Sequence, residues 1–351
     1  MNRYTTSLLV ALIAVGCGNQ DGVEVSRQDA ETEIYREALV NADDVELSFE
    51  SDGTRRQALA GEQSGLASLT ADAVIGTNSL IVGNLAMMRI IASFPPTAIE
   101  DNARIWEGED DGKFYQVRIE KSATPRGTRF DYTLLGRDAA DANADLLPLI
   151  DGDVVRIETR PGVLGRQGFG VLRFHFDNVN TIDPSEGISG TGRIAFRRVG
   201  GVRQVRVRFL NFTSPSDPEF PPAAAYEYVQ LPLGGGAMKW FSVGDVLKDG
   251  QPYENIAVHS AWRKDLSGVG AANVFGGSLD VDYWHLLECW DSTLLKGYEA
   301  IAVPGMNFND GDAASCFAAP EDLDVPEYQD SLPDEDPEIP TAHPEEVETA
   351  E

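Results

Sequence analysis

The sequence predicts a mainly β protein with some α structure, an α+β fold. We expect a single antiparallel sheet, curved or closed into a barrel-like meander, packed around or against a long N-terminal apolar helix. Two observations favour this fold. Residues 64–94 form a mostly apolar stretch of helical length, and after Pro95-Pro96 apolar and polar residues alternate in short segments with no βαβ alternation. The 42% hydrophobic composition of the 351 residues is sufficient for a core.

Segment 64–94 is predicted to form a helix that ends at Pro95. Because its apolar side chains fall on nearly every side, we expect the following β structure to wrap it. A membrane span is the alternative, but Asp72, Asn78 and Arg89 are spread along the segment and disfavour it.

The remainder of the middle region consists of short segments with alternating apolar and polar residues. The candidate strands lie at 115–119, 130–134, 155–157, 172–176, 188–199, 202–212, 225–233, 237–243, 255–263 and 278–288. About ten strands at short intervals favour one antiparallel sheet, arranged as a barrel or a sandwich.

One hairpin is predicted in register. If Gly200-Gly201 is a two-residue turn, residues whose numbers sum to 401 face each other, so that Ile194 pairs with Val207. The opposite face then carries an arginine stripe of Arg193, Arg197, Arg206 and Arg208. Such a stripe could hold an anionic headgroup, a phosphate or the protein's own acidic tail. A solvated face whose arginines pair with nearby carboxylates is the alternative.

The N-terminus is typical of a signal peptide, residues 1–16, because Arg3 precedes an apolar run too short to span a bilayer. The run ends in Ala14-Val15-Gly16-Cys17, which resembles the lipobox of bacterial lipoproteins, whose cysteine is lipidated and becomes residue one. The usual Leu is Ala14 here, so ordinary signal cleavage is the alternative. The resemblance implies secretion across the inner membrane and a palmitate-type anchor at Cys17. Because no Asp follows Cys17, it implies the outer membrane.

The chain divides by composition. After the signal, the expected parts are a tether at 17–28, an N-terminal helix at 29–39 within an irregular region to 63, a helix plus antiparallel β domain at 64–319, and a disordered tail at 320–351. The tail is rich in Pro and holds 13 acidic residues with no Lys or Arg. The net charge of −29 disfavours a nucleic-acid partner, since phosphate neutralisation needs an excess of Lys and Arg.

Two cysteines remain besides Cys17. In an exported chain Cys289 and Cys316 predict a disulfide, which the loop-entropy model values at about 3.5 kcal/mol. Two free thiols or a metal site are the alternatives.

The most distinctive pattern lies near the C-terminus. A strand with Trp262 precedes a Gly-rich stretch, then Glu288-Cys289-Trp290-Asp291 and a last Cys316. This pattern resembles a family of uncharacterised secreted lipoproteins of the myxobacterial type, over residues 65–320. The resemblance implies a lipid-anchored envelope protein, and it supplies no catalytic residues because the family has no known activity.

No catalytic motif is present. A Gly-x-Ser-x-Gly elbow is absent, and His259 cannot pair with Ser260 because adjacent strand residues point to opposite faces. His175 and His285 lie on separate predicted strands without zinc-site spacing, so each is interpreted as an ordinary sheet residue.

Calcium is the one metal for which the sequence offers ligands. Asp310 and Asp312 could supply oxygen atoms, although acidic turns with Gly usually serve backbone geometry. We therefore predict no cofactor.

The sequence predicts a non-enzymatic binding or scaffolding protein of the bacterial cell envelope. Its expected partners are the membrane, through the lipid anchor, and an envelope protein or a lipid. The first alternative is a periplasmic or outer-membrane carrier of an apolar ligand such as a lipid. The second is a hydrolase with an unrecognised active site.

Overall fold

The computed structural model describes residues 27–40, 42–46, 49, 62–160, 163–215, 223–244 and 252–316. The helices are α1 (Arg27–Ala38), α2 (Ala42–Val45), α3 (Gly65–Ser93) and α4 (Phe176–Ile182), with a 3₁₀ turn η1 (Ala313–Ser315). The strands are β1 (Ala98–Ile99), β2 (Ala103–Asp110), β3 (Lys113–Thr124), β4 (Gly127–Asp138), β5 (Leu147–Arg160), β6 (Val163–His175), β7 (Ser189–Val199), β8 (Val202–Thr213), β9 (Ala223–Gln230), β10 (Gly236–Gly244), β11 (Glu254–Trp262), β12 (Gly268–Phe275), β13 (Tyr283–Trp290), β14 (Lys296–Val303) and β15 (Met306–Gly311).

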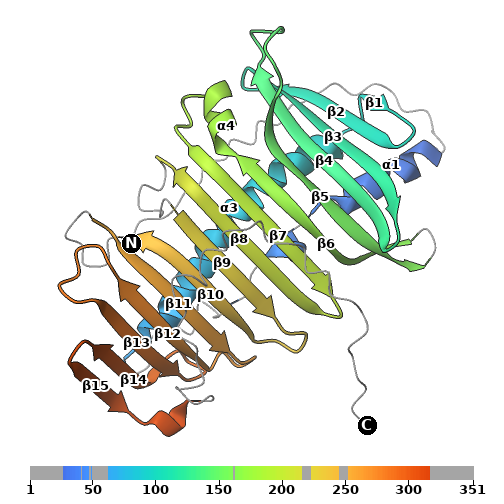
Figure 1. Cartoon of the computed structure of the whole chain (residues 1–351). Helices are drawn as coiled ribbons and strands as arrows, with labels where there is room; N and C mark the ends of the chain where they lie inside the picture. The colour runs from blue at the N-terminus through green and yellow to red at the C-terminus, as the bar shows by residue number, and fades with distance from the viewer. Residues whose placement is uncertain are drawn as a thin grey trace.

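All 15 strands form one antiparallel sheet in which each strand pairs with the next one along the chain (Figure 1). The prediction of a mainly β fold with a single antiparallel sheet is confirmed. The barrel and the sandwich are wrong, because the described strands form one open sheet with β1 and β15 at its two edges.

Several strands were not predicted from the sequence, and β12 shows why. No strand was assigned to this Gly-rich stretch, but its glycines make room for large neighbours. A Cβ atom on Gly268 would lie 2.2 Å from the ring of Trp290, and one on Gly270 would lie 3.2 Å from Leu66 of α3. Phe176, predicted to end a strand, instead begins α4.

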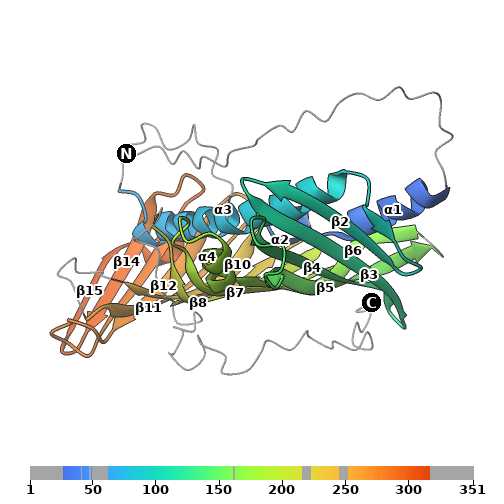
Figure 2. The ribbon, with the colours of Figure 1, turned by 90° about the horizontal axis from the view of Figure 1, so that it is seen from above.

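Helix α3 differs from the prediction in its surroundings. It lies along one face of the sheet, across the strands, and is not wrapped by them (Figures 1 and 2). Its buried side chains include Leu66, Ala67, Ala71, Val74, Leu85, Met88 and Ala92. The opposite side exposes Asp72, Ile75, Arg89 and Ile90, so the expectation that β structure wraps the helix is wrong. Among the described residues, no helix has both the length and the apolarity needed to cross a membrane.

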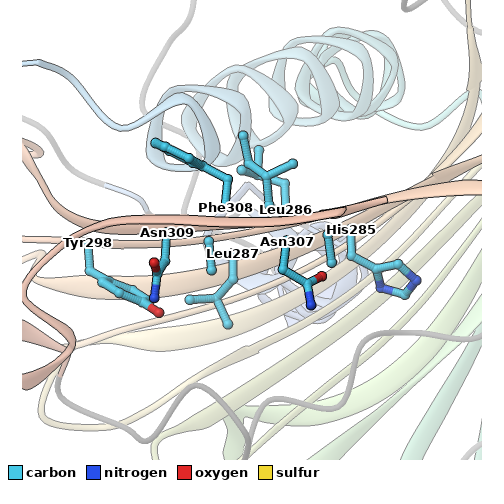
Figure 3. Close-up of a pocket in the computed structure, with 10 residues that line it drawn as sticks. His285, Leu286, Leu287, Tyr298, Asn307, Phe308 and Asn309 are labelled. Atoms are coloured by element: carbon cyan, nitrogen blue, oxygen red, sulfur yellow. The ribbon is translucent and has the colours of Figure 1, made fainter. Parts of the chain in front are cut away.

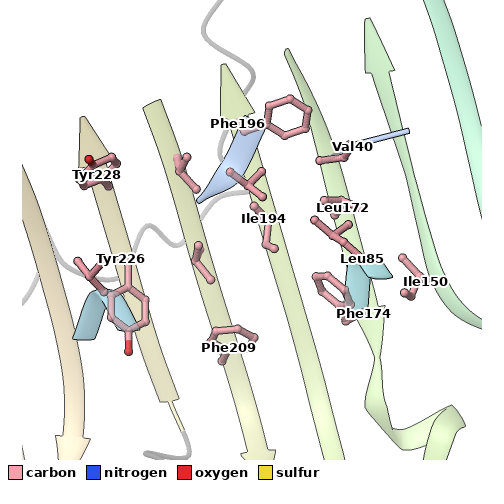
Figure 4. Packing of buried hydrophobic residues seen from close by; sticks show 14 of the residues in the cluster. Val40, Leu85, Ile150, Leu172, Phe174, Ile194, Phe196, Phe209, Tyr226 and Tyr228 are labelled. Atoms are coloured by element: carbon pink, nitrogen blue, oxygen red, sulfur yellow. The ribbon is translucent and has the colours of Figure 1, made fainter. Parts of the chain in front are cut away.

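The core lies between α3 and the face of the sheet beneath it. The buried cluster there includes Leu85 of α3 and aromatic side chains from neighbouring strands, among them Phe174, Phe196 and Phe209 (Figure 4). The predicted hairpin register is confirmed, since Ile194 pairs with Val207. Its turn residues, Gly200 and Gly201, have positive φ angles of 61° and 83°, which a two-residue hairpin turn favours.

The first helix also faces this core. It was expected at 29–39 and runs over Arg27–Ala38, two residues into the segment assigned to the tether. Tyr35 and Ala38 are buried. A buried ion pair holds the next helix, α2, against the sheet. In it, a guanidinium nitrogen of Arg156 on β5 lies 2.7 Å from a carboxylate oxygen of Asp44 on α2.

The N-terminus of α3 is bound by a side chain from far along the chain. One carboxylate oxygen of the buried Glu288, on β13, accepts hydrogen bonds from the Ser64 hydroxyl (2.5 Å) and the Leu66 amide (2.8 Å). Ser64 also caps the helix, because its hydroxyl accepts from the amide of Ala67. Since α3 has no acidic residue in its own first turn, Glu288 supplies the negative charge that a helix N-terminus favours.

The C-terminus of α3 is bound by the opposite charge. Arg36 of α1 donates to the carbonyl oxygens of Ala92 (2.7 Å) and Phe94 (2.9 Å). Because α3 has no basic residue in its last turn, Arg36 supplies the missing positive charge there.

Replacing Glu288 tests whether it holds α3 on the sheet. We expect Glu288→Ala to lower the free energy of unfolding by about 2–4 kcal/mol, because it leaves the buried Ser64 hydroxyl and Leu66 amide without an acceptor. Glu288→Gln keeps one acceptor oxygen and should cost about half as much. Denaturant titration measures both changes. The exposed Glu107→Gln serves as the control, and equal stability of Glu288→Ala and this control would contradict the assignment.

Candidate functional site

The face of the sheet away from α3 carries a row of arginines. Arg193 on β7 pairs directly with Arg173 on β6 and with Arg208 on β8. Directly opposed side chains in a sheet lie about 5 Å apart at Cβ. Arg173, Arg193 and Arg208, which we call the arginine row, therefore stand side by side on three adjacent strands.

The predicted stripe overlaps this row only in part. The register places Arg193, Arg197, Arg206 and Arg208 on one face of the sheet, as predicted. Their partners differ, however. Arg206 forms an ion pair with Glu227 at 2.9 Å, and Arg197 lies opposite the uncharged Gln204. The sequence did not assign Arg173 to the stripe, although it belongs to the row.

The centre of the row is electrostatically strained. Partial burial lowers the pKa of Arg193, and the neighbouring charges of Arg173 and Arg208 lower it further. The carboxylate of Asp153 acts in the opposite direction. A bound anion at this position would relieve the repulsion between the three guanidinium groups.

Carboxylates flank the row on β5. Asp151 accepts a hydrogen bond from Arg173 at 2.9 Å, and its second oxygen lies 2.5 Å from Nε2 of His175. His175, interpreted from the sequence as an ordinary sheet residue, thus belongs to a charged network on this face.

The next carboxylate, Asp153, is more buried. Desolvation raises its pKa, although Arg129, 3.7 Å away, acts against the shift. Asp131 lies directly opposite Asp153 on β4 and adds like-charge repulsion. On this face the carboxylates of Asp151 and Asp153 on β5 therefore border the arginines of β6 to β8.

This network supplies two of the three groups that nucleophilic hydrolysis requires. His175 could act as a base oriented by Asp151, and Thr191 lies directly opposite His175 in the register. Within the described part of the chain, no hydrogen bond joins Thr191 to His175. Ser260 faces the other side of the sheet, where its hydroxyl lies 2.7 Å from that of Thr70.

The candidate calcium ligands do not assemble a site. The side chain of Asp312 accepts from the amide of Ala314 and caps η1, while Asp310 lies opposite Glu299 in the sheet. The residues that the structure describes contain no group of three or more His, Cys, Asp or Glu side chains placed to hold a metal ion.

The predicted disulfide between Cys289 and Cys316 is confirmed. Cys289 lies on the same face of the sheet as the arginine row. The residues that pair with it, strand by strand from β12 to β8, lead to Gln204, which lies opposite Arg197 on that face. Cys17, the signal peptide and the acidic tail lie outside the described residues.

An open apolar hollow of about 340 Å³ lies at the last three strands. Leu287 and Tyr298 line it together with His285, Asn307 and Asn309, and these side chains extend from the strands on the side away from α3 (Figure 3). Desolvation lowers the pKa of His285. The hollow is separate from the aromatic core beneath the helix.

The sequence could not have assigned Arg173 or His175 to the site. The β7–β8 register follows from a two-residue turn, whereas α4 and a loop separate β6 from β7. No turn geometry fixes the pairing between those two strands. Only the three-dimensional structure shows that Arg173 faces Arg193.

No protein-family model, no curated protein and no solved structure matches this chain.

Replacing Asp153 tests the electrostatics of this face. A raised carboxyl pKa means that the folded state holds the proton more tightly than the unfolded chain, so stability falls as pH rises above the ordinary value of 3.8. We therefore expect Asp153→Asn to be more stable than the native protein at pH 7. The difference should disappear below the ordinary pKa. Denaturation midpoints at pH 7 and pH 3 measure this, with Glu109→Gln as the exposed control; a less stable Asp153→Asn at pH 7 would refute it.

Proposed function

We propose that this protein is a lipid-anchored component of the bacterial cell envelope that binds an anionic partner without transforming it. The observation that carries the proposal is the arginine row, in which Arg173, Arg193 and Arg208 lie directly opposite one another. The anchor would be the lipidated Cys17, and the outer membrane its location.

The cost of the arginine row supports a binding role. Like charges directly opposed in a sheet destabilise it, and nothing in the packing of the core requires arginine on the outer face. Guanidinium groups are well suited to bind phosphate or carboxylate oxygens in pairs. The partner class is therefore an anion such as a phosphate-bearing headgroup or a carboxylate cluster on an envelope protein.

The acidic flank supports a defined position for that anion. Asp151 and Asp153 on β5 would repel an anion on one side, and Glu227 on β9 would repel it on the other. These charges leave the surface over β6 to β8 as the favourable binding position for an anion. A patterned face of this kind favours selective binding over general attraction to negative surfaces.

Inorganic pyrophosphate is a suitable probe for this site. We expect the full chain to bind it in isothermal titration calorimetry, and we expect Arg193→Gln to weaken the binding at least tenfold, because it removes a charged hydrogen-bond donor at the centre of the row. The same substitution should leave the free energy of unfolding unchanged or raise it, because it removes like-charge repulsion.

The matched control is Arg118→Gln. Arg118 lies on the same face, on β3, outside the row, and pairs with Glu100 at 2.8 Å. Pyrophosphate affinity should stay at the native value in this variant. Equal losses in both variants would indicate general electrostatic attraction, and no binding by the native chain would overturn the proposal.

A carrier of an apolar ligand is the second candidate, and the hollow at β13–β15 favours it. Its volume of about 340 Å³ lies at the lower end of small-molecule sites. Lipid that co-purifies with the protein, and that is lost in a hollow-filling variant such as Ala300→Phe, would favour the carrier over the anion-binding protein. Hydrolysis remains the third candidate, for which the His175–Asp151 contact is the supporting observation.

Metabolic labelling tests the proposed anchor. We expect radioactive palmitate to be incorporated into the native chain and to be absent from Cys17→Ser, because the thiol is the site of acylation. The variant should also leave the membrane fraction. Incorporation in Cys17→Ser equal to that of the native chain would rule out this anchor.

A further inference from the structure

We infer that the acidic C-terminal segment, residues 320–351, docks on the arginine row and acts as a built-in anionic occupant of that site. The inference rests on the same row as the proposed function, and it names the regulation of that row. Three observations carry it: the face on which the segment starts, the distance it must cover, and its charge.

The disulfide fixes the start of the segment on the correct face. Cys316 is bonded to Cys289 of β13. In the register, Cys289 pairs with Val269, and the series continues strand by strand to Gln204 and Arg197. Because residues paired in this way share a face, the chain leaves the disulfide on the side of the sheet that carries the arginine row and not on the side covered by α3.

The segment is long enough to reach the row. Six interstrand steps separate β13 from β7, which is about 29 Å at 4.8 Å per step. The 35 residues after Cys316 exceed this distance even when only about a third of them are extended, at about 3.3 Å per residue. A tether that can span its site gives its free end a high effective concentration there, on the order of millimolar for a short linker.

The charges of the two partners are complementary. Residues 320–351 contain 13 carboxylates and no Lys or Arg. The flanking acidic residues Asp151 and Asp153 would direct the segment away from β4 and β5, toward the row.

Docking of the tail would raise the affinity that an external anion needs in order to bind the row. A monovalent anion would compete with a tethered occupant at millimolar effective concentration. A partner would displace the tail only by presenting several negative charges at once. The tail would therefore make the site selective for polyanionic surfaces over single ions in solution.

Photo-crosslinking in the full chain tests this inference. The photoreactive amino acid benzoylphenylalanine replaces Tyr328, which is 12 residues beyond Cys316 and within reach of the row when extended, at about 3.3 Å per residue. We expect intramolecular crosslinks, mapped by mass spectrometry, to β6, β7 and β8. Their yield should fall at least fivefold in 1 M NaCl and in Arg193→Gln/Arg208→Gln, but should be unchanged in Arg118→Gln.

Crosslinks that map elsewhere, or that persist unchanged in the double variant, would overturn the inference. A tail variant with Asp334→Asn, Glu335→Gln and Asp336→Asn separates it from the proposed function. If the tail crosslinks to the row while pyrophosphate binds neither this variant nor the native chain, the docking stands and external anion binding fails. If pyrophosphate binds the row equally in both and no crosslink reaches β6–β8, the docking fails and the proposed function stands.

Discussion

Helix α3 depends on two charges that its own sequence does not contain. Glu288 from β13 binds its N-terminus, and Arg36 from α1 binds its C-terminus. The helix contacts β2 and β3 near one edge of the sheet and β11 to β13 near the other. Its length, about 43 Å at 1.5 Å per residue, is close to the roughly 48 Å that separates β3 from β13. With both ends bound, α3 connects β2 and β3 with β11 to β13, which lie far apart in the strand order of the sheet.

This arrangement leaves the two faces of the sheet with different roles. The face under α3 buries the aromatic core and two arginines that already have partners, Arg104 and Arg156. The outer face does not need to hold the helix, so its composition is free to serve binding. Charges of both signs and an apolar hollow at the C-terminal end occur there. In a single-layer sheet, function can therefore concentrate on one face without disturbing the core.

The sequence predicted the features that depend on local chemistry. Alternation along the strands indicated an antiparallel sheet, and Gly200-Gly201 fixed the pairing of β7 with β8. The sequence did not predict the features that depend on distant contacts. The strand that contains Gly268 and Gly270 was missed, because Trp290 and Leu66, which fill the space beside these glycines, are distant in the sequence. The apolar composition of α3 did not show which of its sides the sheet would cover. Arg173 joined Arg193 through a register that no short turn determines.

The strictly sequential order of the strands has a consequence for how the chain reaches its fold. Helix α3 precedes every strand, and each strand needs only the previous one as a template, so the sheet can grow in one direction as successive segments become available. Glu288 belongs to the thirteenth strand, β13. The hydrogen bonds that fasten the start of the helix therefore require β13, and they join the beginning of this region to its end.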